Sequence, residues 1–319
     1  MLRVPPELAG MRLDVFLAMS LRATSRTRAK KIALSAAFST VGQRIRPNQR
    51  MKAEEHVVLW RVASDSADEE LEMPELYRDE HLLVINKPPN ITVHPTASHY
   101  NNTVTKLLES REPGQFFRLI HRLDRDTSGI LLIALTPEAD RAFKRLLEGT
   151  LDLPIGKSDH VQKTYRCITW GVPQDGLIDL PIERDENNSL RVKMKVSAPG
   201  RGLPSQTRVI VEERCEGYAL VRCELLTGRQ HQIRIHLASL GTPVVGDKLY
   251  GPDERMHARG ADGKLTLDDL ERLEMPRQAL HAAKYELLHA ITWQPLVVEA
   301  PLPPDMEQFW RERSAAKAD

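Results

Sequence analysis

The sequence has few of the features that mark secreted, membrane or zinc-binding proteins. It holds only three cysteines in 319 residues, none in a CxxC or zinc-type spacing, and this sparse, odd number favours a reducing compartment. Its apolar runs fall well short of the roughly 18–20 residues that a membrane helix needs. The opening stretch MLRVPPELAGMRLDVF has no basic segment followed by an apolar core, so we expect no secretory signal. We therefore expect a cytoplasmic protein.

Metal and nucleotide motifs are missing as well. There are 11 histidines but no HExxH and no Cys/His quartet, so we predict no metal site. Neither G-x-x-x-x-G-K-[ST] nor G-x-G-x-x-G occurs, which argues against a nucleotide cofactor. Any chemistry must then come from ordinary side chains.

Charge is distributed unevenly along a chain whose net charge is only +1. Residues 1–62 carry 12 Lys and Arg against four acidic residues, whereas residues 63–80 carry eight acidic residues and one Arg. The first segment is typical of a nucleic-acid-binding module and the second of an acidic linker, although a solvated charged surface is the plain alternative. We expect domains at 1–62 and 75–319, joined by a linker over 63–74.

The basic segment predicts two helices, over 12–21 and 24–38, followed by short strands and turns. Its cations gather in the first half of the second helix, at Arg26, Arg28, Lys30 and Lys31. Cations there oppose the helix dipole, which is easier to understand if that end binds phosphate. The helix–helix–strand order with a basic second helix resembles the α-L RNA-binding domain first known from a small-subunit ribosomal protein. The resemblance implies RNA binding by these four residues.

From residue 75 the chain becomes rich in predicted strands. HLLVIN (81–86) and GILLIA (129–134) are apolar enough for buried strands, and KTYRCITWG and ALVRCELL alternate with period two. PEADRAFKRLLE predicts a helix with Thr136 as N-cap and Pro137 at its first position. The order is neither a regular βαβ alternation nor all β. We predict an α+β fold with a large mixed, mostly antiparallel sheet.

The stretch LIHRLDRDTSGILLIA (119–134) places five ionisable residues directly before a buried strand. Charges near the interior are costly unless they are paired. A two-carboxylate glycosidase site is one interpretation, but Asp124 and Asp126 would point the same way and could not face a substrate from opposite sides. We expect Arg125 and Asp126 to form a local ion pair.

The stretch LLTGRQHQIRIHLASLG (225–241) predicts a helix. Thr227 and Gln230 fit a capping box, and Gly241 is a plausible stop. A helix that opens at Arg229 would place a cation where the dipole favours an anion, so we expect RNA phosphate or a buried carboxylate nearby.

Four stretches, taken together and in order, resemble the RluA-type family of RNA pseudouridine synthases. They are HRLDRDTSGILL, KTY, LLTGRQHQIRIHLASLGTPVVGDKLYG and ALHA, preceded by DEHLLVINKPPNITVHP, and they span about residues 75–290. The resemblance implies the pseudouridine synthase fold with a central RNA-binding cleft. It also implies isomerisation of uridine to pseudouridine without a cofactor.

The resemblance also implies roles for single residues. Asp124 would be the catalytic carboxylate and Arg234 its partner, while Tyr165 would stack on the target base and Leu280 would line the opposite side. Arg122 would fill the gap left by the uridine that leaves the RNA helix. Further contacts with RNA or substrate are expected from His121, Arg229, His231 and Gln232.

Several alternatives stay open on the sequence. Asp124 could act as a nucleophile or could remove a ribose proton, and a polar insertion over 252–277 could tune substrate choice. The accessory basic domain favours ribosomal RNA of the large subunit over transfer RNA, and a monomer is the default expectation. A non-catalytic RNA-binding or ribosome-assembly protein on the same fold is the alternative, against which an intact Asp124, Tyr165 and Arg234 argue. A hydrolase that uses Asp124 and Asp126 is disfavoured by the lack of a second facing carboxylate.

Overall fold

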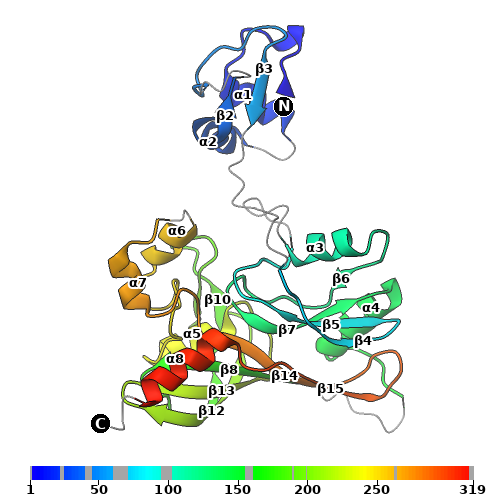
Figure 1. Cartoon of the computed structure of the whole chain (residues 1–319), viewed down its shortest axis with the longest axis vertical. Coiled ribbons are helices and arrows are strands. Elements are labelled where there is room, and N and C mark those ends of the chain that lie inside the picture. Colours follow the sequence, from blue (N-terminus) through cyan, green and yellow to red (C-terminus); the bar gives the residue numbers. More distant parts are fainter. Residues whose placement is uncertain are drawn as a thin grey trace. The chain divides into compact units, whose positions relative to one another are not determined.

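The chain folds into two compact units, residues 1–69 and 70–319 (Figure 1). The structure, a computed structural model, describes residues 2–21, 25–39, 45–59, 71–94, 103–154, 161–188, 190–198, 200–261 and 264–315. Most of the predicted linker, 63–74, lies outside the described residues. Among the described residues, no helix is long and apolar enough to cross a membrane.

The N-terminal unit packs two helices on a small sheet. The helices are α1 (Leu13–Ser20) and α2 (Arg26–Ala36), after a short 3-10 turn, Pro6–Leu8. The antiparallel strands β1 (Leu2–Arg3), β3 (His56–Leu59) and β2 (Ala37–Phe38) lie in that order. Leu13, Phe16 and Leu17 of α1 are buried against Ala29 and Ala33 of α2. The spacing of the apolar residues in α1 follows the helical period.

The second unit is built on one large mixed sheet. Its strands run in the order β4-β5-β7-β14-β8-β13-β12-β9, with β15 paired to β14 and β6 paired to β7. The bounds are β4 (Glu75–Arg78), β5 (Leu82–Lys87), β6 (Arg118–Leu119), β7 (Ser128–Ala134), β8 (Gln162–Trp170), β9 (Gly176–Asp179), β12 (Gln206–Cys215), β13 (Tyr218–Leu225), β14 (Leu280–Leu288) and β15 (Pro295–Glu299). A separate hairpin pairs β10 (Ile182–Arg184) with β11 (Met194–Val196). The pairing of β7 with β14 is parallel and those of the other strands of the sheet are antiparallel. The predicted α+β fold is confirmed.

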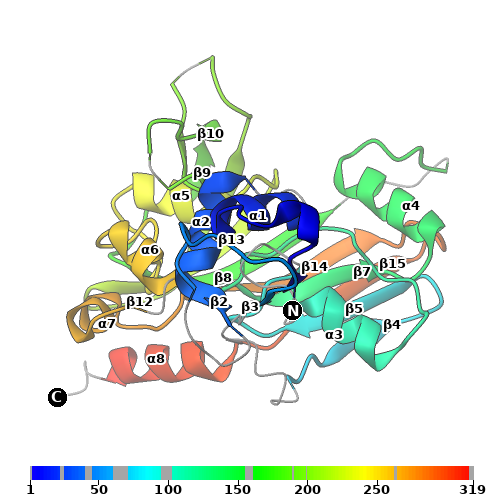
Figure 2. The same cartoon turned by 90° about the horizontal axis from the view of Figure 1, so that it is seen from above.

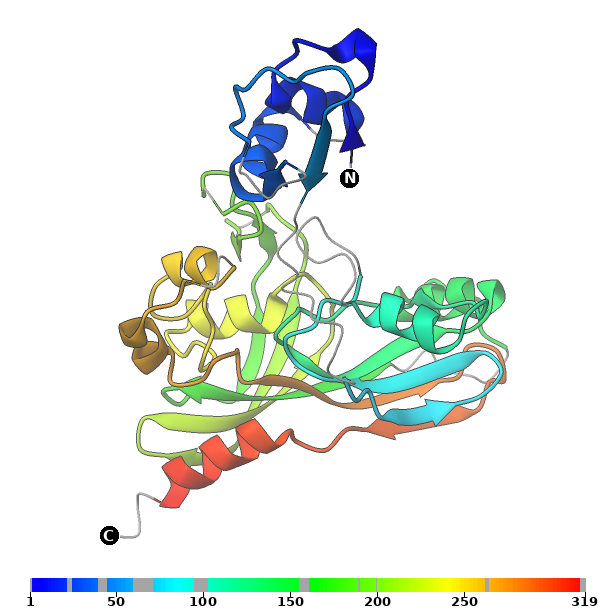
Figure 3. The same cartoon turned by 45° about the horizontal axis from the view of Figure 1, so that its top comes forward.

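Helices cover both faces of this sheet. Figures 2 and 3 show α3 (Val104–Arg111), α4 (Pro137–Leu147) and α5 (Gln232–Ser239) over one face. The pair α6 (Arg255–Ala261) and α7 (Leu267–Leu273) flanks α5, and it is the polar insertion 252–277 that the sequence singled out. On the opposite face, α8 (Pro304–Ala315) packs on β12, where Trp310 donates a hydrogen bond to Glu213.

The local signals of α4 and β7 are confirmed by the structure. The Thr136 hydroxyl accepts a hydrogen bond from the amide of Ala139, and Pro137 is the first residue of α4. All seven residues of β7 are buried, because the strand lies inside the sheet between β5 and β14. A continuous apolar run is what such a strand requires.

Gly129 lies where the two parallel strands approach most closely. It pairs with Ala282 of β14 and has a φ of +108°. A Cβ atom at this position would overlap the carbonyl oxygen of Ala282 and lie 2.7 Å from its nitrogen. Only glycine therefore allows β14 to approach β7 directly after the charged loop 119–127.

Replacing Gly129 by Ala should lower the free energy of unfolding by about 3 kcal/mol or more, since the backbone is strained and β14 must move. Urea unfolding followed by circular dichroism measures this change. Gly114→Ala is the matched control, because Gly114 also has a positive φ but has open space around it, so strain alone should cost about 1 kcal/mol. Equal losses in the two variants would contradict the steric argument.

Candidate active site

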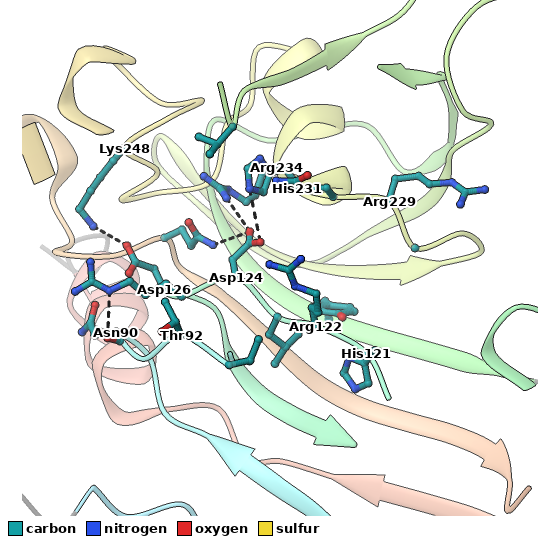
Figure 4. Close-up of a pocket in the computed structure, with 18 of the residues that line it drawn as sticks. Asn90, Thr92, His121, Arg122, Asp124, Asp126, Arg229, His231, Arg234 and Lys248 are labelled. Atoms are coloured by element: carbon teal, nitrogen blue, oxygen red, sulfur yellow. Dashed lines mark hydrogen bonds and ion pairs between the residues drawn. The ribbon is translucent and has the colours of Figure 1, made fainter. Parts of the chain in front are cut away.

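A pocket of about 840 Å³ opens on the face of the sheet that α5 covers (Figure 4). Segments that are far apart in the sequence line it, among them 90–94, the loop 120–126, the start of β8, the segment 228–234 and the end of the insertion. Three of the sequence stretches singled out above thus meet around one space. A smaller adjoining pocket brings in Leu280 of the fourth stretch.

Asp124 lies at the centre of the loop that leads into β7. The carbonyl of Asp124 accepts a hydrogen bond from the amide of Thr127, which closes a turn immediately before the buried strand. Lys87, at the end of the neighbouring strand β5, is fully buried. It donates hydrogen bonds to the carbonyl of Arg125 and to those of Pro88 and Ile91. Burial lowers the pKa of Lys87 to about 7. Backbone and lysine together hold the loop rigidly at the end of β7.

Arg234 of α5 joins Asp124 to a second carboxylate, Asp247. Its Nη1 donates to Asp124 Oδ2 at 2.7 Å, while Nε and Nη2 donate to the two oxygens of Asp247 at 2.6 and 2.8 Å. The Asp247 side chain has no exposed surface, whereas 29% of the Asp124 side chain is exposed. The guanidinium carbon also lies 5.1 Å from the centroid of the Tyr250 ring. Asp247 and Tyr250 therefore fix Arg234 with Nη1 directed at Asp124.

These contacts keep Asp124 ionised. Burial raises its pKa, but the charge and the hydrogen bond of Arg234 outweigh burial, and the net pKa lies below the ordinary value of 3.8. His231 Nε2 lies 3.7 Å from Asp124 Oδ1, yet burial lowers the pKa of His231 to about 4, so this ring is neutral at pH 7. Arg234 thus supplies the stabilising charge at neutral pH. Gln278 adds a weak hydrogen bond of 3.4 Å.

The start of α5 differs from the predicted capping box. The helix begins at Gln232, and His231 before it has a left-handed φ of +58°. The hydroxyl of Thr227 and the amide of Arg229 both donate to the side-chain oxygen of Gln232. The expectation that Thr227 and Gln230 cap the helix, and that Arg229 opens it, is therefore wrong. The side chain of Gln232, inside the helix, accepts the hydrogen bonds that hold the preceding turn. Gly241 follows the end of the helix with a φ of +76°, as expected.

Tyr165 and Leu280 border the space next to Asp124. The smaller pocket is lined by both side chains, by Asp124 and by the exposed Arg122. The Tyr165 hydroxyl lies 2.8 Å from that of Tyr285, and burial raises the pKa of Tyr165 to about 12. An aromatic face and an aliphatic side chain thus flank a slot beside an ionised carboxylate.

Some of the other residues predicted to contact RNA line the pocket, and some form hydrogen bonds that hold the surrounding backbone. Arg229 and His231 line the pocket, but in Figure 4 the Arg229 side chain points away from Asp124, and its Nε donates to the carbonyl of Pro204. His121 Nε2 accepts a hydrogen bond from the amide of Leu132, and burial lowers the pKa of His121 to about 3. Gln232 is buried and holds the start of α5. His121 lines the pocket as a neutral ring, and Gln232, whose side chain holds the start of α5, also lines the smaller pocket.

The two aspartates of the loop have different partners. Asp126 accepts a hydrogen bond from Lys248 Nζ at 2.8 Å, and Arg125 Nε donates to the carbonyl of Asn90 (Figure 4). The expected ion pair between Arg125 and Asp126 is therefore wrong. The turn carries the two side chains to separate partners, so Asp126 ties the loop to the segment that follows Asp247.

The four basic residues of α2 belong to the N-terminal unit. Arg26 and Lys30 are exposed, and Arg26 Nε lies 3.8 Å from the buried Asp14. The side chains of Arg28 and Lys31 lie outside the described part of the chain.

Three residues of the site were not predicted from the sequence, namely Asp247, Lys87 and Tyr285, although two of them lie in the motif stretches given above. A polar residue inside an otherwise apolar run, as in VVGDKLY or LLVINKPP, was the available signal. The insertion contributes His257, Gly260, Ala261 and Leu265 to the pocket wall. Among the described residues, no group of three His, Cys, Asp or Glu side chains could hold a metal ion.

Comparisons with known proteins identify relatives along nearly the whole chain. Residues 81–239 match the family described as RNA pseudouridylate synthase. The chain is 33% identical to ribosomal large subunit pseudouridine synthase D of Xanthomonas campestris pv. campestris, over 99% of this chain and 94% of that protein. It is 35% identical to the protein of the same name from Nitrosomonas europaea, over 96% and 85%. The solved structure of human RNA pseudouridylate synthase domain containing 1 is 26% identical, with a TM-score of 0.55 over 76% of this chain and 95% of that one.

Replacing Arg234 by Met should lower the free energy of unfolding by about 3–5 kcal/mol at pH 7, since two carboxylates lose their partner. In the wild type the pKa values of Asp124 and Asp247 are lowered by Arg234. The ionised carboxylates therefore stabilise the folded state fully above pH 3.8, and this stabilisation is lost as the pH falls further. The difference between variant and wild type should therefore shrink below pH 3.8. Urea unfolding at several pH values measures it.

Arg255→Met is the matched control for this substitution. The Arg255 side chain is 80% exposed and pairs only with its neighbour Asp253, so its loss should leave the free energy of unfolding nearly unchanged. A difference between Arg234→Met and wild type that stayed constant down to pH 2 would show that lost packing, rather than the ion pairs, explains the result.

Proposed function

The chain belongs to the RNA pseudouridylate synthase family, and we propose that it isomerises uridine to pseudouridine in ribosomal RNA of the large subunit, with Asp124 as the catalytic group. The observation that carries the catalytic assignment is the ion pair between Asp124 and Arg234. It holds an ionised carboxylate at the pocket surface, beside Tyr165 and Leu280. The large-subunit substrate is supported by the names of the bacterial relatives.

The reaction requires a group that attacks or deprotonates the nucleoside. The N-glycosidic bond breaks, the uracil turns, and its C5 bonds to C1′; C5 loses a proton while N1 gains one, so no cofactor is needed. Asp124 can begin this sequence as a nucleophile or by removal of a ribose proton, and either route needs the anion. The lowered pKa of Asp124 keeps it ionised at pH 7. Arg234, held by Asp247, acts as its positioning partner.

The slot beside Asp124 suits a base that has left its helix. Stacking on an aromatic ring contributes about 1–3 kcal/mol per base, which offsets part of the few kcal/mol that flipping costs. Tyr165 offers that ring and Leu280 the opposite wall, and both adjoin Asp124. The hydroxyl of Tyr165 keeps its proton at pH 7, because burial raises its pKa to about 12. Arg122 is exposed at the same place and can replace the stacking lost in the RNA.

The N-terminal unit is proposed as an α-L-type RNA-binding domain over residues 1–62. Its two helices and three-stranded sheet, with exposed Arg26 and Lys30 on the second helix, suit contact with phosphate. The acidic linker 63–74 and a catalytic domain over 75–319 complete the proposed organisation. An added basic domain favours a large structured RNA over transfer RNA. We place the protein in the cytoplasm, as a monomer.

Release of tritium from RNA labelled at uracil C5 tests the reaction directly, because C5 loses its hydrogen. Purified protein should release tritium from large-subunit ribosomal RNA prepared without its pseudouridines. Transfer RNA transcripts should release little. Release from transfer RNA alone would overturn the proposed substrate, and no release from any RNA would favour a binding protein on the same fold.

Substitution of the two loop aspartates separates catalysis from scaffolding. Asp124→Asn should abolish tritium release while the protein still folds and binds RNA, since Arg234 keeps its two hydrogen bonds to Asp247. Asp126→Asn should retain release and lose stability, because its partner is Lys248. Tritium release by Asp124→Asn at the wild-type rate would refute the catalytic assignment.

The salt dependence of RNA binding tests the N-terminal unit. Replacing Arg26, Arg28, Lys30 and Lys31 by Gln should weaken binding and reduce the slope of log K against log salt by up to about 3. Filter binding at several salt concentrations from about 50 to about 300 mM measures this slope. The same substitutions should leave kcat unchanged at saturating RNA. An unchanged slope would mean that this helix does not contact phosphate.

A further inference from the structure

Lys163 lies on the pocket side of the sheet, two residues before Tyr165. Alternate residues of a strand face the same way, so both side chains point toward the pocket from β8. Lys163 is paired in the sheet with Tyr285 on β14 and with Leu225 on β13. His121 lines the same pocket, and the Lys163 charge lowers the pKa of His121. Lys163 thus shares its part of the pocket with two tyrosines, a histidine and an aliphatic residue.

None of these neighbours is an anion at neutral pH. The hydroxyls of Tyr165 and Tyr285 are bonded to each other and burial raises the pKa values of both. His121 is neutral and accepts a hydrogen bond from the amide of Leu132. Within the described residues, Lys163 forms no ion pair with a carboxylate and donates no side-chain hydrogen bond.

Two other lysines near the pocket, unlike Lys163, have hydrogen-bond or ion-pair partners. Lys87 is more deeply buried, but it donates to three backbone carbonyls. Lys248 pairs with Asp126. Burial lowers the pKa of Lys163 to about 8, and no described charge raises it again. A partly buried ammonium without an anion loses hydration and gains nothing in return, so its position is costly to the free protein.

We propose that Lys163 binds a backbone phosphate of the RNA next to the flipped uridine. RNA carries one phosphate per nucleotide, and a base seated against Tyr165 brings its flanking phosphates to the pocket walls. An ammonium group is a compact donor to phosphate oxygen. This inference rests on the proposed function, because it assumes that the base of an RNA nucleotide occupies the slot between Tyr165 and Leu280.

A role as general base at C5 is the competing explanation for a lysine beside Tyr165. A base for that step must reach the reacting uracil, next to Asp124. The Asp124 charge raises the pKa of Tyr165 but does not contribute to that of Lys163. Tyr165 lines the smaller pocket together with Asp124, whereas Lys163 is named among the lining residues of the larger pocket only. Tyr165 is therefore the better placed of the two for the step at C5.

Phosphate binding by Lys163 would couple RNA affinity to pH. In the free protein the pKa of Lys163 is about 8, and a bound phosphate would raise it. RNA binding then takes up a proton above pH 8, so affinity should fall as the pH rises through that value. His121, Tyr165 and Tyr285 do not titrate between pH 7 and 9 in the free protein, and Leu225 is apolar, so they leave this signal unchanged.

The experiment compares wild type, Lys163→Met and Lys163→Arg in tritium release and in filter binding of large-subunit ribosomal RNA. Lys163→Met should raise KM and the dissociation constant about tenfold, with kcat changed less than twofold, and should reduce the salt slope by about one. Its resistance to urea should equal or exceed that of wild type, because an uncompensated cation is removed. Lys163→Arg should bind like wild type at pH 7 and lose the decline above pH 8. Lys144→Met, a surface substitution on α4 where Lys144 pairs with Asp140, is the control that should change none of these.

Two outcomes would overturn the proposal. A stability loss in Lys163→Met with unchanged RNA affinity would make Lys163 a structural residue. A large fall in kcat with unchanged KM would assign it to the chemical step. If wild type released no tritium, the proposed function would fail, while the binding constants, salt slope and pH dependence would still test whether Lys163 contacts phosphate.

Discussion

The site depends on one guanidinium group shared by two carboxylates. Arg234 donates two hydrogen bonds to the fully buried Asp247 and one to Asp124. Three charges of this kind are stable in the interior only when every hydrogen bond is made, because the desolvation of each ion is costly. Asp247 meets that requirement with two further hydrogen bonds from the amides of Leu249 and Tyr250. Asp124 can then keep its charge while part of its side chain faces the pocket.

The rest of the catalytic unit positions this contact. The parallel pairing of β7 with β14 depends on the missing side chain of Gly129, and it sets the charged loop at the edge of the pocket. Lys87 holds the same loop from inside the sheet by its bond to the carbonyl of Arg125. Asp126 holds it from outside through Lys248, which follows Asp247 in the chain. The backbone of the Asp124 loop is therefore held at three points, while the carboxylate oxygens face Arg234 and the pocket.

The proposed recognition of a nucleotide involves two kinds of surface in the pocket. Tyr165 and Leu280 offer apolar surface for a base, and the neutral rings of His121 and His231 add no charge at pH 7. Cations line the larger pocket around this slot, Arg122 and Lys163 among them. Such an arrangement separates a dry surface for the base from charged groups for the backbone. The insertion with α6 and α7 adds to the pocket wall, with His257 among the lining residues.

Patterns in the sequence determined the elements and their chemistry, and the tertiary structure decided the partners. Apolar runs and the Thr136–Pro137 signal predicted β7 and the start of α4, because these depend on neighbours a few residues away. The family motifs predicted that Asp124, Tyr165, Arg234 and Leu280 act together. The Thr227–Gln230 cap and the Arg125–Asp126 pair were wrong, since Gln232 and Lys248 offered better partners. Asp247 and Lys87 were missed for the same reason: a hydrogen bond between residues that are far apart in the chain forms only where the folded backbone brings donor and acceptor within 3 Å or so.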